Sequence, residues 1–317
     1  MYNYIPSRVR NVHCFCKRFS KIYYSYHCRR NKSTAQTNIA AKNKLGRALF
    51  FLQGKSNDET EYKIFEQRIF EIIEKCHRDK ILFLGCDISS RVTGYGLLGA
   101  DGTGIDCGGI KTDTSPDVID ICNEIEDFLN SKIKPIMRTK QYEDYELNII
   151  FEDCMTSYSP GRFNARGLMK LAQVNGIARF ATEKSFGIRP QLIHPTGARG
   201  FFQLLRAKAG DKTVIKKRVY NYVTEFAPDL PWLVSGKELA YDMTDGYLVA
   251  MYARAMYFKH AIISDKLLWE SVGVHPSILD NNIRAAYGKV AIDILDKNIQ
   301  EWLKERRGVI GLGLEND

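Results

Sequence analysis

Short apolar runs separated by glycine-rich turns follow one another closely in the first half of the chain. Runs of this length, bounded by small residues, are typical of buried strands, and their close spacing predicts an antiparallel meander. A helix before them, from Ser56 to Lys80, is indicated by apolar residues on one face and by Ser56 or Asp58 as an N-terminal cap. The three expected strands span 81–88, 93–100 and 104–111.

Helices and strands alternate in the second half of the chain. Two further strands are expected at 147–151 and 189–194, with a polar loop at 131–146. Helices are expected at 116–130, 164–185, 213–226, 237–259 and 277–306. This order predicts an α/β fold in which helices flank a mixed sheet. We divide the chain into a basic segment (1–56), a lead-in helix (57–80), a central domain (81–260) and a C-terminal helical extension (261–317).

The formal charge of +9 is distributed unevenly. Residues 1–56 contain 12 Lys or Arg and no Asp or Glu, so the other 34 basic residues accompany 37 acidic ones. An acid-free, arginine-bearing N-terminus is typical of an organellar transit peptide, most simply mitochondrial, with a plastid or nuclear location less favoured. The alternative is a basic tail that contacts nucleic acid directly. No uninterrupted run of 18 apolar residues occurs, so no membrane span is expected.

Five of the eight cysteines lie beyond residue 56, and none of them forms a C-x-x-C pair. We therefore expect buried reduced thiols rather than a zinc site or a disulfide framework. The five are Cys76, Cys86, Cys107, Cys122 and Cys154.

Two of the apolar strand runs end in an acid. The first run ends at Asp87, and the run 147–151 is followed by Glu152, so neighbouring strands would bring these two carboxylates together. Asp242 and Asp245 stand three residues apart near the start of an apolar helix, where both can face one side. A favourable position at the helix N-terminus could explain one of this pair, but less readily both.

Four converging carboxylates would repel one another unless cations were present. Hard oxygen ligands suit Mg²⁺ or Mn²⁺, and two such ions about 4 Å apart can activate a water and stabilise the leaving oxygen of a phosphodiester. Taken singly, each acid has a structural alternative. Two strand ends and one helix start together favour a metal-dependent phosphodiesterase.

These motifs resemble those of the RuvC-type Holliday junction resolvases. The stretch Gly85–Gly96 is similar to the first motif of the family, and Ile150-Phe151-Glu152 to its second acidic strand. Lys170–Gly176 resembles the helix that follows, and Asp242-Met243-Thr244-Asp245 the closing acid pair, so the resemblance runs from about residue 81 to 256. The chain departs from the family at Ile88-Ser89, where Pro-Gly is common. The loop after Glu152 is also about five residues longer than in the bacterial enzymes of the family.

The resemblance implies an RNase H-like mixed five-stranded sheet flanked by helices, with the N-terminal segment and the C-terminal tail outside it. It also implies that four-way DNA junctions are the substrate, that the protein is a homodimer, and that two Mg²⁺ or Mn²⁺ ions bind per site. The metal-binding catalytic acids would be Asp87, Glu152, Asp242 and Asp245. Lys212 aligns with a family lysine near the scissile phosphate, and Lys216 is the rival assignment.

Residues 162–218 contain 13 Lys or Arg against two acids, Glu183 and Asp211, which gives a net charge of +11. Such a stretch suits phosphate neutralisation, although solvated helix faces are the ordinary alternative. Tyr158 or Phe163, in the loop after Glu152, could stack on junction bases as the resemblance implies, or anchor the loop. His194 could approach the metals or be a structural histidine. The basic residues expected to contact DNA are Arg162, Arg166, Lys170, Arg199, Lys208, Lys216, Lys217 and Arg218.

The sequence therefore favours a metal-dependent endonuclease that acts on four-way DNA junctions in an organelle. One rival is an RNase H-like nuclease that cuts another substrate, such as an RNA–DNA hybrid or a flap. The other is a nucleic-acid-binding scaffold without catalysis, for example in organelle ribosome assembly. Retention of all four acids argues against the scaffold.

Overall fold

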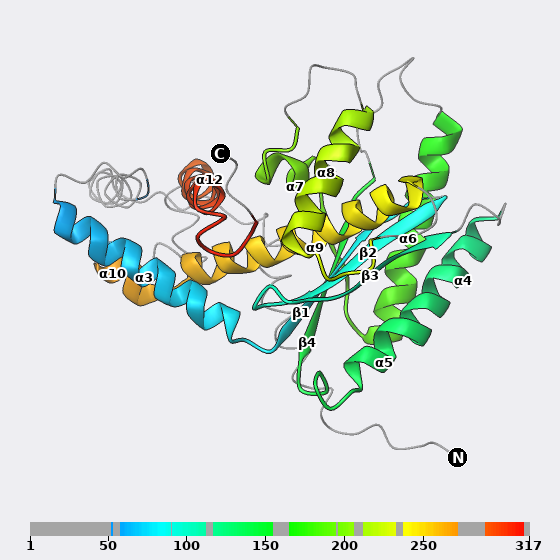
Figure 1. The fold of residues 1–317 in the computed structure, drawn as a ribbon, viewed down its shortest axis with the longest axis horizontal. Helices are drawn as coiled ribbons and strands as arrows, with labels where there is room; N and C mark the ends of the chain where they lie inside the picture. Colours follow the sequence, from blue (N-terminus) through cyan, green and yellow to red (C-terminus); the bar gives the residue numbers. More distant parts are fainter. Residues whose placement is uncertain are drawn as a thin grey trace, which may run out of the picture.

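A central sheet carries helices on both faces (Figure 1). The computed structural model of the chain describes residues 52, 58–89, 91–111, 117–154, 165–194, 196–205, 212–232, 237–271 and 289–313.

The sheet has five strands in the order β3-β2-β1-β4-β5. Its first three strands form an antiparallel meander, and β4 and β5 run parallel to β1. This order and these directions are those of an RNase H-like sheet, so the expected mixed five-stranded fold is confirmed. The strands are β1 (Ile81–Asp87), β2 (Val92–Gly99), β3 (Gly104–Lys111), β4 (Glu146–Glu152) and β5 (Gln191–Ile193).

The expected helices are present, and two short helices, Gly197–Phe201 and Lys266–Ser271, were not expected. Asp58 caps the lead-in helix by accepting hydrogen bonds from the backbone N–H groups of Thr60 and Glu61. The expected C-terminal helix begins only at Lys289 within the described residues, and residues 277–288 lie outside them. The bounds are α3 (Glu59–His77), α4 (Val118–Phe128), α5 (Lys134–Met137), α6 (Ala165–Phe186), α7 (Gly197–Phe201), α8 (Lys212–Phe226), α9 (Lys237–Ser264), α10 (Lys266–Ser271) and α12 (Lys289–Glu305).

The prediction of a loop over residues 131–146 is wrong in its first part. A π-helical turn, η2 (Leu129–Ile133), continues α4 and leads into α5. Leu129 and Ile133 are both buried, and their spacing of four residues keeps them on one helix face despite the polar residues between them. Residues 138–144 form turns before β4 begins.

Alternate residues of the central strands point to two separate cores. In β1, Leu82, Leu84 and Cys86 pack with residues of α4 and α6, whereas Ile81 and Phe83 pack with residues of α9. In β4, Phe151 belongs to the α4–α6 side and Ile150 to the α9 side. Because side chains alternate along a strand, residues 87 and 152 both belong to the face that α9 covers.

Helix α9 lies so close to that face that only glycines fit between them. A Cβ at Gly94 would overlap the carbonyl oxygen of Asp242, and one at Gly85 would overlap the backbone of Ala250. A Cβ at Gly96 would likewise overlap the Cα of Tyr247. On the helix, a Cβ at Gly246 would overlap the backbone of Gly94. Glycine normally weakens a strand, and here it permits a close backbone approach. We call Gly85, Gly94, Gly96 and Gly246 the glycine seam.

The lead-in helix and the C-terminal tail pack together at the far end of α9. Arg306 donates hydrogen bonds from Nε to Glu66 and from Nη2 to the hydroxyl of Tyr62, both 2.8 Å long. Buried Arg254 of α9 ties the same region to the sheet by donating to the carbonyl oxygens of Ala100 and Gly311. Helix α9 itself runs to Ser264 and so crosses the boundary expected at residue 260.

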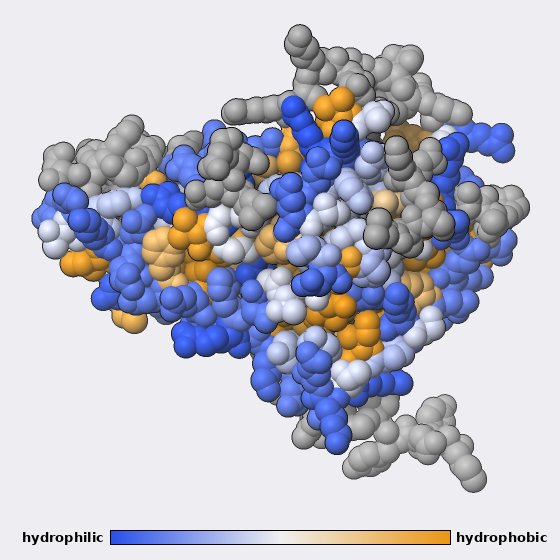
Figure 2. All heavy atoms as spheres, in the orientation of Figure 1, coloured by the Kyte–Doolittle hydropathy of each residue, from blue (hydrophilic) through white to orange (hydrophobic). Residues whose placement is uncertain are grey.

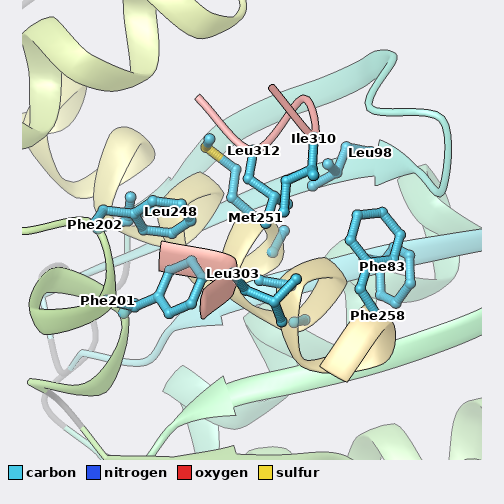
Figure 3. Packing of buried hydrophobic residues seen from close by; sticks show 14 of the residues in the cluster. Phe83, Leu98, Phe201, Phe202, Leu248, Met251, Phe258, Leu303, Ile310 and Leu312 are labelled. Carbon is cyan, nitrogen blue, oxygen red and sulfur yellow. The ribbon is translucent and has the colours of Figure 1, made fainter. Parts of the chain in front are cut away.

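The C-terminal turn completes the core on the α9 side. Figure 3 shows Ile310 and Leu312 beside Met251 of α9, with Leu303 of α12 in the same cluster. The hydroxyl of Tyr222 in α8 donates to the carbonyl oxygen of Leu312, so the tail also contacts the helix that carries the basic residues.

The surface is predominantly polar on the face seen in Figure 2, where apolar residues show through in separate patches. Among the described residues, no helix combines the length and the apolar character needed to cross a bilayer. The five cysteines beyond residue 56 are free thiols, as expected; Cys154 is half-buried and the other four are buried.

We expect Gly94→Ala to lower the free energy of unfolding by more than about 3 kcal/mol, or to prevent folding, because the new methyl group would overlap the backbone of α9. Gly167→Ala is the matched control: it lies within α6 with open space around its Cβ position. That substitution should stabilise the protein by about 0.5–1 kcal/mol. Chemical denaturation measures both, and a Gly94→Ala protein as stable as wild type would contradict the tight seam.

Candidate active site

Asp87 and Glu152 lie side by side at one edge of the sheet. Strands β1 and β4 are parallel, and Cys86 pairs with Phe151, so the following residues emerge together. Both belong to the face covered by α9 through the strand alternation described above. The two strand-end acids therefore lie close together, as expected for neighbouring strands.

The glycine seam brings Asp242 and Asp245 to the same place. Asp87 pairs with Gly94 across β1 and β2, and Gly94 abuts the backbone of Asp242. The side chain of Asp245 is only 2% exposed. Four carboxylates from two strands and one helix thus surround the end of β1.

This gathering of acids raises the pKa values of several of them. Burial, then the charges of Glu152 and Asp245, raises the pKa of Asp87 well above its usual range. Burial raises the pKa of Glu152 to about 7, although Arg199 acts in the opposite direction. The pKa of Asp245 is also raised by burial, against the opposing effect of Arg199. The site is therefore short of positive charge.

Two basic side chains reach into the acidic cluster. From α7, Arg199 places Nη2 3.0 Å and Nε 3.3 Å from Oδ1 of Asp245, with Nη2 3.9 Å from Oε2 of Glu152. From α8, Lys216 donates a hydrogen bond of 2.7 Å to Oδ1 of Asp242. Burial alone would lower the pKa of each base, but the neighbouring carboxylates raise both.

Polar contacts hold the strand ends in position. After Asp87, the hydroxyl of Thr93 donates to the carbonyl oxygen of Ser89 and accepts from its N–H group, which closes the turn between β1 and β2. The side-chain amide of buried Asn175 in α6 donates to the carbonyl oxygen of Glu152 at 2.8 Å. Asn175 falls within the helix motif recognised in the sequence, but its role as a support for Glu152 was not anticipated.

The carboxylate oxygens of the four acids suit a hard divalent cation, although their side chains are not arranged to coordinate one. Among the described residues, no group of three His, Cys, Asp or Glu side chains is arranged to hold an ion. The cations Arg199 and Lys216 contact the carboxylates instead. Oδ2 of Asp245 is buried with no hydrogen-bond partner in the described part of the chain. A buried carboxylate oxygen without a partner, amid other acids, fits a metal ligand.

The other expected site residues are distributed along α6, α7 and α8. Arg166 and Lys170 lie in the first turns of α6, and Lys217 and Arg218 follow Lys216 on α8. Lys212 begins α8, but its side chain lies outside the described part, so the choice between Lys212 and Lys216 stays open. Tyr158, Arg162, Phe163 and Lys208 also lie outside the described residues.

His194 is exposed at the end of β5, with Nδ1 2.9 Å from the hydroxyl oxygen of Thr196. This local contact accords with the structural alternative. Arg199 was expected only as a DNA contact, and its place between two acids was missed. Its one sequence signal is its position in an acid-free stretch, residues 184–210, within the otherwise acid-bearing part of the chain beyond residue 56.

In the absence of metal, the raised pKa of Glu152 should make the protein less stable as the pH rises. A carboxyl whose pKa is higher in the folded state stabilises it when protonated, fully below about pH 4.5, and this contribution is lost as the pH rises to about 7. We expect a loss of up to about 3 kcal/mol over this range in EDTA. Glu152→Gln should remove that part of the pH dependence.

Glu146→Gln, at the exposed start of the same strand, is the control and should retain the wild-type slope. Denaturant unfolding at several pH values measures all three proteins. Equal slopes for wild type and Glu152→Gln would contradict the predicted titration.

Comparison with models of protein families and with curated proteins finds no match. Solved structures that resemble the chain include "T. thermophilus RuvC in complex with Holliday junction substrate", with 14% identity, a TM-score of 0.35, and coverage of 55% of this chain and 95% of that one. A second Thermus thermophilus RuvC structure gives 14% identity, a TM-score of 0.34, and coverage of 55% and 96%. The yeast mitochondrial Holliday junction resolvase Ydc2 gives 13% identity, a TM-score of 0.34, and coverage of 75% and 98%. All three of these solved structures are of Holliday junction resolvases, and two of them are RuvC.

Proposed function

We propose that this protein is a metal-dependent, structure-selective endonuclease that resolves four-way DNA junctions by hydrolysing phosphodiester bonds. The observation that carries the proposal is the gathering of Asp87, Glu152, Asp242 and Asp245 around one strand end, with a buried oxygen of Asp245 left without a partner. Burying several acids together costs free energy that folding alone does not recover. Such a cluster is accounted for by a ligand that carries positive charge.

The four acids would hold two Mg²⁺ or Mn²⁺ ions, which supply an activated water and stabilise the leaving oxygen. Because they extend from the sheet and from α9, the carboxylates would hold these ions, and through them the reacting phosphate, in a fixed position. We assign Lys216 to offset charge on that phosphate, since its ammonium already lies at the edge of the cluster on Asp242. Lys212, one turn earlier on α8, is the residue that the family resemblance assigns to this role, so both lysines stay candidates.

The basic residues of α6 and α8 would form the DNA surface beside this site. Arg166 and Lys170 are near the start of α6, which follows β4 and Glu152, and Lys217 and Arg218 are exposed on the helix that supplies Lys216. Together with Arg162 and Lys208, they would neutralise phosphates and make binding strongly dependent on salt. Tyr158 or Phe163 would stack on bases at the junction. The composition of residues 1–56 supports a mitochondrial location.

We test the catalytic proposal with Asp87→Asn in the full-length chain, using synthetic four-way junctions, duplex, RNA–DNA hybrid and flap in Mg²⁺. Junction cleavage should fall by at least about a hundredfold, because even an outer-shell partner of a metal can be worth 10–100-fold. Junction binding, measured by gel shift in Ca²⁺, should persist. Asp120→Asn, on the exposed side of α4, is the control and should cut like wild type.

Cleavage of hybrids or flaps alone would replace the junction proposal with the other nuclease. Binding without cleavage of any substrate by the wild-type protein would favour the non-catalytic scaffold. If Asp87→Asn cuts junctions as fast as wild type, the assignment of the acidic cluster is wrong.

A junction has two symmetry-related strands to cut, so we propose that two copies of the chain act together through α6. Met169 and Phe180 are 67% and 68% exposed, and their spacing of eleven residues puts them on one face of that helix. Gly176 lies between them with open space at its Cβ position, which would allow close approach of a second helix.

Light scattering of the full-length chain should give the mass of a dimer, and Phe180→Asp should shift it toward the monomer. Ile119→Asp, at a similarly exposed apolar position on α4, is the control and should leave the dimer intact. A monomeric wild-type protein at micromolar concentration would contradict this proposal.

A further inference from the structure

Arg199 is placed against the acids by a short, firmly packed element. Helix α7 spans only five residues, but Ala198 and Phe201 within it and Phe202 after it are buried in the core beneath α9. Phe201 packs edge-on against Tyr252 of α9, with the ring centres 5.6 Å apart. The backbone of Arg199 is therefore held in place, while its side chain, 22% exposed, keeps a path to solvent.

The guanidinium occupies the space between two of the four acids. Nη2 lies 3.0 Å from Asp245 and 3.9 Å from Glu152, so a single nitrogen faces both carboxylates. Both Nε and Nη2 contact the same oxygen of Asp245, Oδ1, and leave Oδ2 buried without a partner. A guanidinium matched to one carboxylate would use both oxygens. The arrangement is that of a cation shared among acids.

The charge balance of the cluster also indicates that Arg199 is a cation shared among several acids. When ionised, the four carboxylates carry four negative charges, and Arg199 with Lys216 returns only two. Arginine stays protonated under all ordinary conditions, so its charge cannot be removed by proton loss. A divalent ion that binds Asp245 and Glu152 would meet this fixed charge at close range, where repulsion is weakly screened.

We propose that Arg199 is a resident cation that takes the place of a divalent ion in the metal-free protein and competes with that ion for Asp245 and Glu152. The inference rests on the proposed function in assigning metal ions to these acids. It adds that the chain carries its own competitor, which stabilises the empty cluster and sets the metal concentration at which the site fills. A purely structural ion pair would stabilise the fold without opposing the metal.

The test measures metal binding without DNA. Full-length wild type, Arg199→Met and Arg199→Lys are stripped with EDTA and titrated with Mn²⁺, and free Mn²⁺ is followed by electron paramagnetic resonance. Arg199→Met should bind Mn²⁺ about tenfold more tightly, or about 1.4 kcal/mol, because the competing charge is gone. Arg199→Lys should fall between, since a lysine ammonium is a compact charge without the planar fork.

The melting temperature provides a second readout. In EDTA, Arg199→Met should melt below wild type, because the acids lose a counter-charge, and saturating Mn²⁺ should close that gap. Arg189→Met is the matched control: its partner Glu183 is 3.7 Å away on an exposed surface, and both measurements should match wild type.

Unchanged or weaker Mn²⁺ binding by Arg199→Met overturns the inference. If that variant does not fold, Arg199→Lys decides by the same criterion. Tighter binding by an Arg199 variant, in a protein that cuts no junction, would support the inference while contradicting the proposed function. Absence of Mn²⁺ binding by every variant would overturn both.

Discussion

The backbone contact between α9 and the central strands is the constraint on which the site depends. Three glycines of the sheet and one of the helix bring the two backbones together without intervening side chains. A larger residue anywhere in this seam would lift the helix away from the sheet. The distance between the acids of the strands and the acids of α9 is therefore set by the absence of four Cβ atoms.

The glycine seam also explains why ionising these buried acids costs free energy and why basic side chains lie beside them. Asp87, Glu152 and Asp245 are buried where α9 meets the sheet, and this burial raises their pKa values. Arg199 and Lys216 offset part of this charge from two separate helices, α7 and α8. The C-terminal turn contacts α8 through Tyr222 and packs on α9 through Ile310 and Leu312, so segments outside the RNase H-like core also support the site.

The sequence predicted the strands and the four acids because an apolar run that ends in a carboxylate is a local signal. It could not reveal that Asp87 and Glu152 share a face, since both sides of β1 are apolar and the alternation is hidden. The strand glycines held that information, but without a structure they resemble turn residues. Arg199 was missed as a partner of Asp245 because the two lie 46 residues apart and α7 is too short to show a pattern. The prediction of a loop at 131–146 was wrong because the polar residues between Leu129 and Ile133 hid the helical spacing of this buried pair in η2.

Anomalous scattering from a crystal of the full-length protein grown with Mn²⁺ tests whether these acids hold metal ions, as we propose. We expect anomalous peaks within about 2.5 Å of carboxylate oxygens of Asp87 and Asp245. Crystals in which α9 keeps its place on the glycine seam and the cluster binds no ion at millimolar Mn²⁺, or in which the ions bind only elsewhere on the chain, would contradict a metal centre at these acids.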